Sequence, residues 1–234
     1  MLWIRGMLAA CAVAVCSTVT MGQDHDAVKP VPREGGWMNR HNSFNERVKQ
    51  GNVDLLFIGD SITQGWEGAG KEVWAKSYGH RNAVNLGIGG DRTQHVLWRL
   101  DHGNVDGINP KLAVLMIGTN NSGTNTSEQI ADGVTAIVKK LREKLPNTKV
   151  LILGIFPRGA DASDPKRKVN EGANAIIAKL ADGKMVEYLD IGPKFLNADG
   201  TLSKEIMPDL LHLSPKGYQI WADSIEEHVK RMME

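Results

Sequence analysis

Short apolar runs alternate with longer stretches of helical periodicity along most of the chain. Five runs rich in Val, Ile, Leu and Phe have the length of buried strands, and they cover residues 53–58, 82–86, 112–117, 150–156 and 186–189. Most segments between them repeat apolar residues every three or four positions, which is typical of helices packed on a sheet. This alternation predicts a single-domain three-layer α/β/α sandwich with a central five-stranded parallel sheet.

Helix-boundary residues support the predicted helices. Residues 126–129 (Thr-Ser-Glu-Gln) have the pattern of a capping box ahead of a long apolar periodicity. Another helix is predicted to begin near Pro165, and the last helix has Ser214 as its N-cap with Pro215 in its first turn. Residues 37–49 predict an amphipathic helix lying on the sheet. Helices are therefore expected on both faces.

The first 22 residues have the pattern of a secretory signal peptide. Arg5 precedes an uncharged apolar run, and small residues near Gly22 predict cleavage there. An uncleaved membrane anchor is the alternative, because the apolar run is borderline for a span. Residues 23–36 predict a loose linker without chemistry, and residues 37–234 a single domain. We therefore expect an exported protein, periplasmic or secreted, with no stable membrane insertion after processing.

The composition of the chain excludes several classes of site and partner. Both cysteines, Cys11 and Cys16, lie in the predicted signal, so the processed chain would offer neither a disulfide nor a thiol nucleophile. A formal net charge of +1 gives no field that would attract nucleic acid. Zinc and calcium motifs are absent, and the glycine-rich residues 87–91 lack the spacing of a dinucleotide site. We predict no metal, no cofactor and no nucleic-acid partner, and the oligomeric state stays open.

A serine at the end of the first predicted strand is the candidate nucleophile. An apolar run ends at Gly59-Asp60-Ser61, and open parallel sheets keep their sites at the carboxyl ends of strands. A serine hydroxyl needs a base, an acid to orient that base, and donors for the developing oxyanion. The alternative for Ser61 is a plain helix N-cap. Asp60 is expected to hold the tight turn through backbone donors.

His212 is the candidate base, because it lies in a loop just before the last predicted helix. Asp209, three residues earlier, can reach the other ring nitrogen through a short turn and fix the tautomer of the imidazole. His212 would take the proton of Ser61 and later give it to the leaving alcohol. The alternative for Asp209 is a turn residue. Ser61, Asp209 and His212 are thus the predicted catalytic residues.

Four ordered blocks of the chain resemble the GDSL or SGNH hydrolase family. The blocks are Gly59-Asp60-Ser61, the glycine of Gly-Gly-Asp at Gly90, residues 118–120 (Gly-Thr-Asn), and Asp209-x-x-His212. Within that family, the long block 85–100 and Pro157-Arg158-Gly159 are most similar to the catalytic subunits of the intracellular platelet-activating-factor acetylhydrolase branch. The likeness extends from about residue 37 to the C-terminus.

The resemblance implies an SGNH, flavodoxin-like fold and an oxyanion hole. The hole would be formed by the Ser61 and Gly90 amides with the side-chain amide of Asn120, and the missing side chain of Gly90 would let the substrate oxygen approach. The alternative for Gly90 is a plain turn, with Asp91 capping the next helix. Many relatives have aspartate where this chain has Asn121, and the acetylhydrolase-like branch shares the asparagine.

These features predict a serine esterase that hydrolyses short-chain, most simply acetyl, carboxylic esters through an acyl-enzyme. The alcohol portion is left open: O-acetylated carbohydrate would suit an exported protein, and a lysophospholipid or another small ester is the alternative. A non-catalytic carbohydrate-binding protein on the same fold is a third possibility. Trp66, Trp74 and Arg158 are candidates for contacting the leaving group, although the tryptophans equally suit the core.

Overall fold

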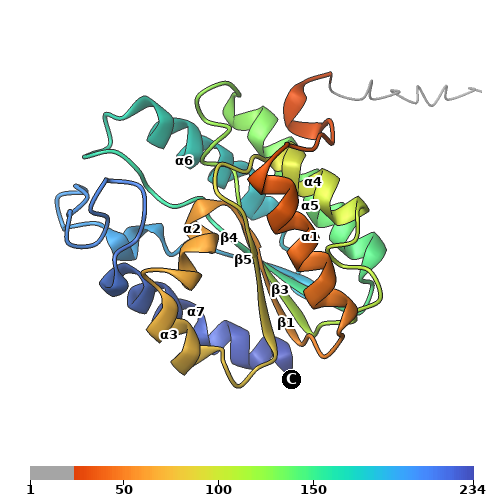
Figure 1. Ribbon diagram of the computed structural model, residues 1–234. Helices are drawn as coiled ribbons and strands as arrows, with labels where there is room; N and C mark the ends of the chain where they lie inside the picture. The colour runs from red at the N-terminus through yellow and green to blue at the C-terminus, as the bar shows by residue number, and fades with distance from the viewer. Residues whose placement is uncertain (1–23) are drawn as a thin grey trace, which may run out of the picture.

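Five parallel strands lie side by side at the centre of the computed structural model, which describes residues 24–234 (Figure 1). The strands are β1 (Leu55–Gly59), β2 (Ala83–Gly87), β3 (Leu112–Met116), β4 (Lys149–Leu153) and β5 (Val186–Leu189), in the order β2-β1-β3-β4-β5. Gly59 at the end of β1 is in register with Gly87 of β2 and Met116 of β3. These three strands therefore end at one level, and the loops that follow them meet there.

Helices cover both faces of the sheet (Figure 1). The α-helices are α1 (Gly36–Lys49), α2 (Ser61–Gln64), α3 (Lys71–Ser77), α4 (Thr93–Asp101), α5 (Ser127–Lys144), α6 (Pro165–Ile177) and α7 (Pro215–Met233). Short 3₁₀ turns are η1 (Asp26–Val28), η2 (Gly65–Glu67), η3 (Ala178–Leu180) and η4 (Gly192–Phe195). The predicted capping box of α5 and the N-cap of α7 are confirmed, with Thr126 and Ser214 accepting from backbone amides.

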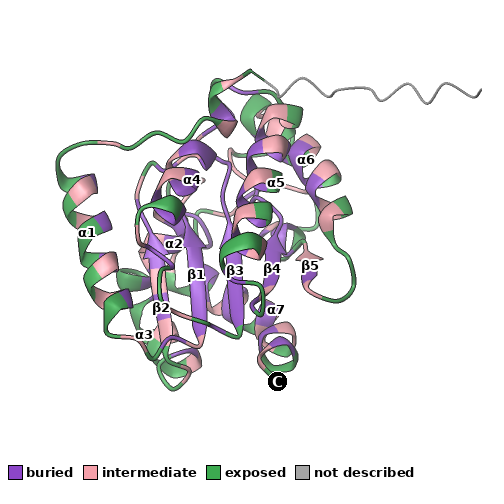
Figure 2. Cartoon of the chain, turned by 90° about the vertical axis from the view of Figure 1, so that its right-hand side faces the viewer, coloured by how far each residue is buried: buried purple, intermediate pink, exposed green. Residues whose placement is uncertain are grey.

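Strand side chains alternate between two cores, one on each face of the sheet. Leu56 and Ile58 of β1 pack with residues of α1, α4, α5 and α6, whereas Leu55 and Phe57 pack with residues of α2, α3 and α7. All of β1 and β3 is buried, as a parallel sheet between two helical layers requires (Figure 2). The predicted three-layer sandwich with five parallel strands is confirmed.

The fourth strand is shorter than its apolar run predicts. The run covers residues 150–156, but β4 ends at Leu153. Beyond it, the backbone N–H and carbonyl of Ile155 bond to the side-chain amide of Asn174 in α6, at 2.7 and 3.0 Å. A side chain there replaces a neighbouring strand, so the segment stays buried without belonging to the sheet.

The segment expected to be a loose linker lies against the helices of the domain. Ala27 in η1 is buried, and its carbonyl accepts a hydrogen bond from Thr93 Oγ1 at 2.7 Å. Asn125 Nδ2 donates to Asp26 Oδ1 at 2.5 Å, and Val31 N–H donates to the carbonyl of Gln94. Periodicity could not indicate this packing, because it depends on single polar contacts with residues far along the chain.

The predicted signal peptide, residues 1–22, lies outside the described residues. Within residues 24–234, none of the helices has the length and apolar character needed to span a bilayer.

Candidate active site

Ser61 lies two residues after the end of β1, at the sharp turn into α2. Asp60 is the N-cap of α2, and its Oδ1 accepts from the Ile62 backbone N–H at 2.9 Å, as expected for a residue that holds this turn. Gly59 has no room for a side chain, because a Cβ there would collide with the Met116 carbonyl and Thr63. The turn therefore places the Ser61 side chain at the carboxyl edge of the sheet, as the first residue of the helix rather than its cap.

His212 connects Ser61 to Asp209 through both of its ring nitrogens. Its Nε2 lies 2.9 Å from Ser61 Oγ, and its Nδ1 lies 2.6 Å from Asp209 Oδ2. The backbone N–H groups of Leu211 and His212 donate to Asp209 Oδ1 at 3.1 and 2.7 Å. Asp209 therefore fixes both the loop and the imidazole, and a Nδ1–H donor leaves Nε2 free to accept from the serine.

The electrostatics of this loop favour a charged Asp209. Partial desolvation opposes ionisation, but hydrogen bonds from the side chain and backbone of His212 outweigh it and lower the pKa of Asp209. The side chains of His212 and Asp209 are 44% and 57% exposed, so water and a substrate can reach them. A carboxylate that stays ionised beside the outer ring nitrogen can stabilise an imidazolium.

The glycine-rich loop after β2 contains a backbone N–H group that has no acceptor among the described residues. Gly90 has φ +74°, in the left-handed region that favours glycine, and its N–H has no acceptor within residues 24–234. The amide of the preceding Gly89, in contrast, donates to Gln64 Oε1 at 2.7 Å. Asn120 donates through Nδ2 to the carbonyl of Asp91 at 2.9 Å, which leaves its second amide hydrogen available.

Asp91 is the centre of a buried polar network, not the helix cap that the sequence suggested. The N-cap of α4 is Arg92, whereas the fully buried Asp91 carboxylate accepts from Arg99 Nε at 2.9 Å and Trp37 Nε1 at 2.6 Å. Burial raises the pKa of Asp91, and Arg99 opposes that shift. The hydrogen bonds of this network therefore offset the desolvation cost of burying the Asp91–Arg99 ion pair.

Arg33 and Arg99 are site residues that the sequence reasoning missed. Arg33 Nη1 donates to the Gly89 carbonyl at 2.8 Å and lies 3.3 Å from Asp91 Oδ1. Arg99 is 1% exposed, although arginine is seldom buried without a partner. Its position three residues after Val96, on the apolar face of the predicted helix, was the one available signal for a buried carboxylate nearby.

Asp60 is a second buried carboxylate, adjacent to Ser61. Complete burial raises the pKa of Asp60 to about 7, and its Oδ2 has no partner among the described residues. The Ile62 amide lowers this pKa and the neighbouring Asp91 raises it further. Near neutral pH, Asp60 therefore exchanges between neutral and ionised forms.

Two of the three residues predicted to contact the leaving group, Trp66 and Arg158, are placed differently. Trp66 is 1% exposed and belongs to an aromatic cluster of the core, where its ring lies 5.0 Å from that of Trp221. Arg158 lies beside the site, but its Nη1 donates to the carbonyl and Oγ1 of Thr119, at 3.2 and 3.1 Å. Residues 24–234 contain no group of three or more His, Cys, Asp or Glu side chains that could hold a metal ion.

Comparison with known proteins identifies relatives across most of the chain. The family described as GDSL-like Lipase/Acylhydrolase matches residues 57–220. Human platelet-activating factor acetylhydrolase IB subunit alpha1 is 40% identical over 203 residues, which are 84% of this chain and 86% of that protein. The alpha2 subunit from Rattus norvegicus is 37% identical over 212 residues, 89% of this chain and 90% of its own.

Solved structures share the fold at lower identity. A GDSL-like lipase from Bacteroides thetaiotaomicron has a TM-score of 0.63 and 18% identity, covering 82% of this chain and 97% of its own. An acetyl xylan esterase has a TM-score of 0.62 and 24% identity, covering 76% of this chain and 100% of its own. These two likenesses concern the fold alone.

The prediction that the protein is exported is wrong. The curated relatives that match over most of the chain are platelet-activating factor acetylhydrolase IB subunits, which agrees with the resemblance of the sequence blocks to the intracellular acetylhydrolase branch. The export prediction depended entirely on the apolar pattern of residues 1–22, which lie outside the described part of the chain. An N-terminal apolar run alone does not outweigh a relationship that extends over four fifths of the sequence.

Arg99→Met is expected to lower the free energy of unfolding by about 3–5 kcal/mol, because it removes the buried cation 2.9 Å from the Asp91 carboxylate and leaves only the more exposed Arg33 at 3.3 Å. Urea unfolding measures the loss. Lys216→Met is the matched control: it removes an exposed pair with Glu205, 2.8 Å long, which is worth about 0–1 kcal/mol. Equal losses in the two variants would contradict the central role of the Asp91 network.

Asp60→Asn is expected to remove a pH-dependent loss of stability. The pKa of Asp60 is about 7 in the folded protein against an ordinary value of 3.8, so between these values the folded state holds a proton that the unfolded state has lost. The free energy of unfolding contributed by Asp60 therefore falls as pH rises from about 4 to about 7. The asparagine keeps an acceptor for Ile62 and does not ionise.

Urea unfolding of both proteins at a series of pH values tests this expectation. The stability advantage of Asp60→Asn over the wild type should grow through this window and become constant above about pH 7. An advantage that is the same at pH 4 and pH 7 would show that the Asp60 carboxyl is not desolvated.

Proposed function

Because the chain belongs to the GDSL-like lipase/acylhydrolase family and is a carboxylic ester hydrolase, we propose that it hydrolyses short-chain esters, most simply acetyl esters, through an acyl-enzyme on Ser61. The observation that carries the proposal is the unbroken hydrogen-bond chain Ser61–His212–Asp209, at 2.9 and 2.6 Å. Its first and last members are more than 140 residues apart in sequence. Such an arrangement is what a weak hydroxyl nucleophile requires.

Ser61 Oγ attacks the ester carbonyl carbon as its proton passes to His212 Nε2. Asp209, ionised and bonded to Nδ1, holds the ring in the tautomer that can accept this proton and stabilises the imidazolium that forms. The C–O bond to the alcohol then breaks, and the imidazolium gives its proton to the departing oxygen. Water attacks the acyl group by the same route and releases the acid and Ser61.

Three donors are proposed to hold the oxyanion of the tetrahedral intermediate. The Ser61 amide lies at the start of α2, where helix amides lack intrahelical acceptors. The Gly90 amide has no acceptor among the described residues, and Asn120 has a second amide hydrogen beyond the one bound to Asp91. Preorganised donors of this kind stabilise charge that develops only in the transition state.

The acetyl preference is supported by the relatives at 37–40% identity, which are named acetylhydrolases. The alcohol portion is less constrained. O-acetylated carbohydrate was favoured because it would suit an exported protein. Since the export prediction is wrong, neither a carbohydrate nor a lipid alcohol is favoured over the other. A non-catalytic binding protein is disfavoured, since a mere binding site gives no reason to keep serine, histidine and aspartate in one hydrogen-bond chain.

Ser61→Ala is expected to reduce hydrolysis of p-nitrophenyl acetate by roughly 10⁴-fold or more, and Asn120→Ala by about 10²–10³-fold, because the first removes the nucleophile and the second one oxyanion donor. Initial rates and circular dichroism of each variant measure activity and fold. Ser224→Ala, a partly exposed serine in the middle of α7, is the control and should keep full activity. Activity that survives Ser61→Ala would eliminate the mechanism.

Acyl-chain length separates an acetylesterase from a lipase. We expect kcat/KM for p-nitrophenyl acetate to exceed that for the butyrate by roughly tenfold, with the octanoate slower still, since a pocket fitted to a short acyl group rejects extra methylenes. Alkaline hydrolysis of the same esters corrects for their intrinsic reactivity. A maximum at the octanoate would replace the acetyl preference with a lipase-type preference.

A further inference from the structure

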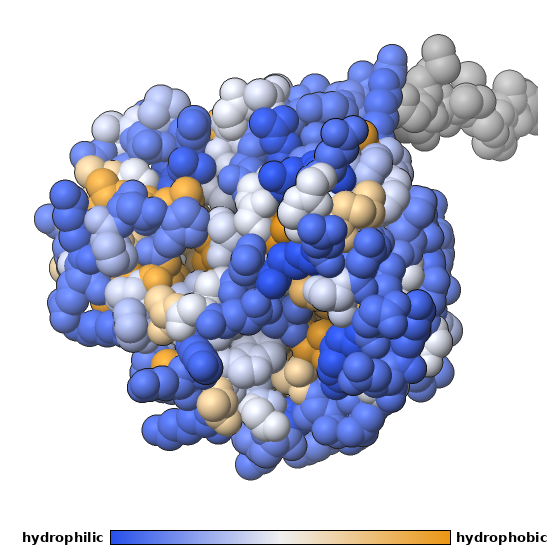
Figure 3. Space-filling view, in the orientation of Figure 1, coloured by the Kyte–Doolittle hydropathy of each residue, from blue (hydrophilic) through white to orange (hydrophobic). Residues whose placement is uncertain are grey.

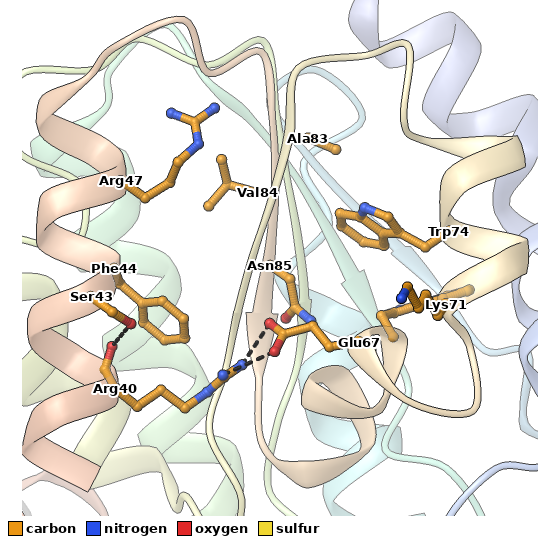
Figure 4. A pocket seen from close by; sticks show the side chains of 11 residues that line it. Arg40, Ser43, Phe44, Arg47, Glu67, Lys71, Trp74, Ala83, Val84 and Asn85 are labelled. Atoms are coloured by element: carbon orange, nitrogen blue, oxygen red, sulfur yellow. Dashed lines mark hydrogen bonds and ion pairs between the residues drawn. The ribbon is translucent and has the colours of Figure 1, made fainter. Parts of the chain in front are cut away.

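A groove runs along the outer edge of the sheet, between α1 and α3, with β2 as its floor (Figure 4). It has a volume of about 490 Å³, and we call it the edge groove. We propose that the edge groove binds the alcohol portion of the ester, and that this alcohol portion carries a negative charge next to a ring or other apolar body. The inference rests on the proposed esterase function, because it assigns a place to the half of the substrate that leaves Ser61.

The edge groove adjoins the site of the proposed chemistry. A second hollow, of about 410 Å³, is lined by Ser61, Gln64, Gly65, Glu67 and Gly68. Glu67 also lines the edge groove, so the two hollows share a wall. An alcohol portion that extends from Ser61 past the Arg40–Glu67 pair would reach the groove between α1 and α3.

Positive charge gathers in the edge groove. Its lining includes three cations, Arg40, Arg47 and Lys71, against the single carboxylate of Glu67. Arg47 donates to the backbone carbonyls of residues 51 and 52, and neither Arg47 nor Lys71 has a carboxylate partner among residues 24–234. Since the whole chain has a formal net charge of only +1, this local excess favours an anion in the groove.

The Arg40–Glu67 pair determines where that anion would lie. Arg40 bonds both carboxylate oxygens of Glu67, at 3.0 and 2.7 Å, and its Nε donates to the Gly87 carbonyl at 2.8 Å. Figure 4 shows the pair crossing from α1 towards η2 at one end of the groove, with Arg47 at the other end. Glu67 thus opposes a negative charge close to Ser61, whereas Lys71, on the α3 wall, and Arg47, at the far end, attract one inside the groove (Figure 4).

Aromatic side chains supply the apolar wall of the edge groove. Trp74 is half-buried: one part packs on Phe57, with ring centroids 5.1 Å apart, and the exposed part faces the groove opposite Phe44 (Figure 4). In the space-filling view, pale and orange side chains lie in hollows between hydrophilic rims (Figure 3). Aromatic walls with a few charged groups are typical of sites for small organic ligands.

Matched acetyl esters test the proposal on the full chain. The neutral probe is an acetylated methyl galactoside, and the charged probe is the corresponding acetylated galacturonide, which differs from it only by a carboxylate. Acetylated glycerol 3-phosphate is the third probe, with a lipid-type phosphate and no ring. We expect kcat/KM at low salt to be about tenfold higher for a charged probe than for the neutral one, falling as salt is added.

Lys71→Gln should remove most of this preference. Lys76→Gln is the matched control, because Lys76 lies on the same helix, is exposed and does not line the edge groove, and it should keep the wild-type preference. Glu67→Gln should increase the preference, since it removes the only carboxylate of the lining. The galacturonide and phosphate arms show whether an acidic sugar or a lipid-type headgroup is the source of the charge.

The outcomes distinguish this inference from the proposed function. A charge preference that Lys71→Gln abolishes and Lys76→Gln retains supports the edge groove as the alcohol site. Equal kcat/KM for charged and neutral probes, or a preference that Lys71→Gln leaves intact, overturns it. If the wild-type chain still hydrolyses p-nitrophenyl acetate in that case, the esterase mechanism stands and only the groove assignment fails.

Discussion

The buried ion pair between Asp91 and Arg99 is the interaction on which the arrangement of the site depends. Asp91 lies in the loop after β2, and its backbone carbonyl accepts from Asn120 in the loop after β3. Arg99 extends from α4 to the Gly59 carbonyl at the end of β1, 3.4 Å away. One pair of charges thus connects the ends of three strands, and it is tolerated because Asn104 and Trp37 occupy its remaining hydrogen-bonding positions.

Parallel topology explains why residues so far apart in sequence meet at this edge. Helical crossovers connect consecutive parallel strands, so all strands run in the same direction. The loops that follow them therefore lie at the same edge of the sheet. Ser61 arrives after β1, Gly90 after β2 and Asn120 after β3, while His212 comes from the loop before α7. The Gly159 amide bonds the Leu210 carbonyl, which fastens that last loop to the one after β4.

Local patterns in the sequence predicted the sheet, and the family blocks pointed to Ser61, His212 and Asp209, which lie in one hydrogen-bond chain in the structure. Apolar runs mark buried strands, and Gly-Asp-Ser marks the turn after the first of them. The docking of Ala27 and Arg33 could not be predicted in this way, since it depends on single contacts with residues more than fifty positions away. Export was inferred from local pattern alone, and there the pattern was misleading.

Burial separates the carboxylates of the site into different roles. Asp209 is more than half exposed, and its pKa is lowered despite partial desolvation, so it stays ionised at neutral pH. Asp60 is fully buried, and burial raises the pKa of its carboxyl to about 7. Burial disfavours the charged form of Asp60, whose Oδ1 holds the turn at Ile62. The exposed Asp209 carboxylate bonds Nδ1 of His212 at 2.6 Å, and this leaves Nε2 directed towards Ser61.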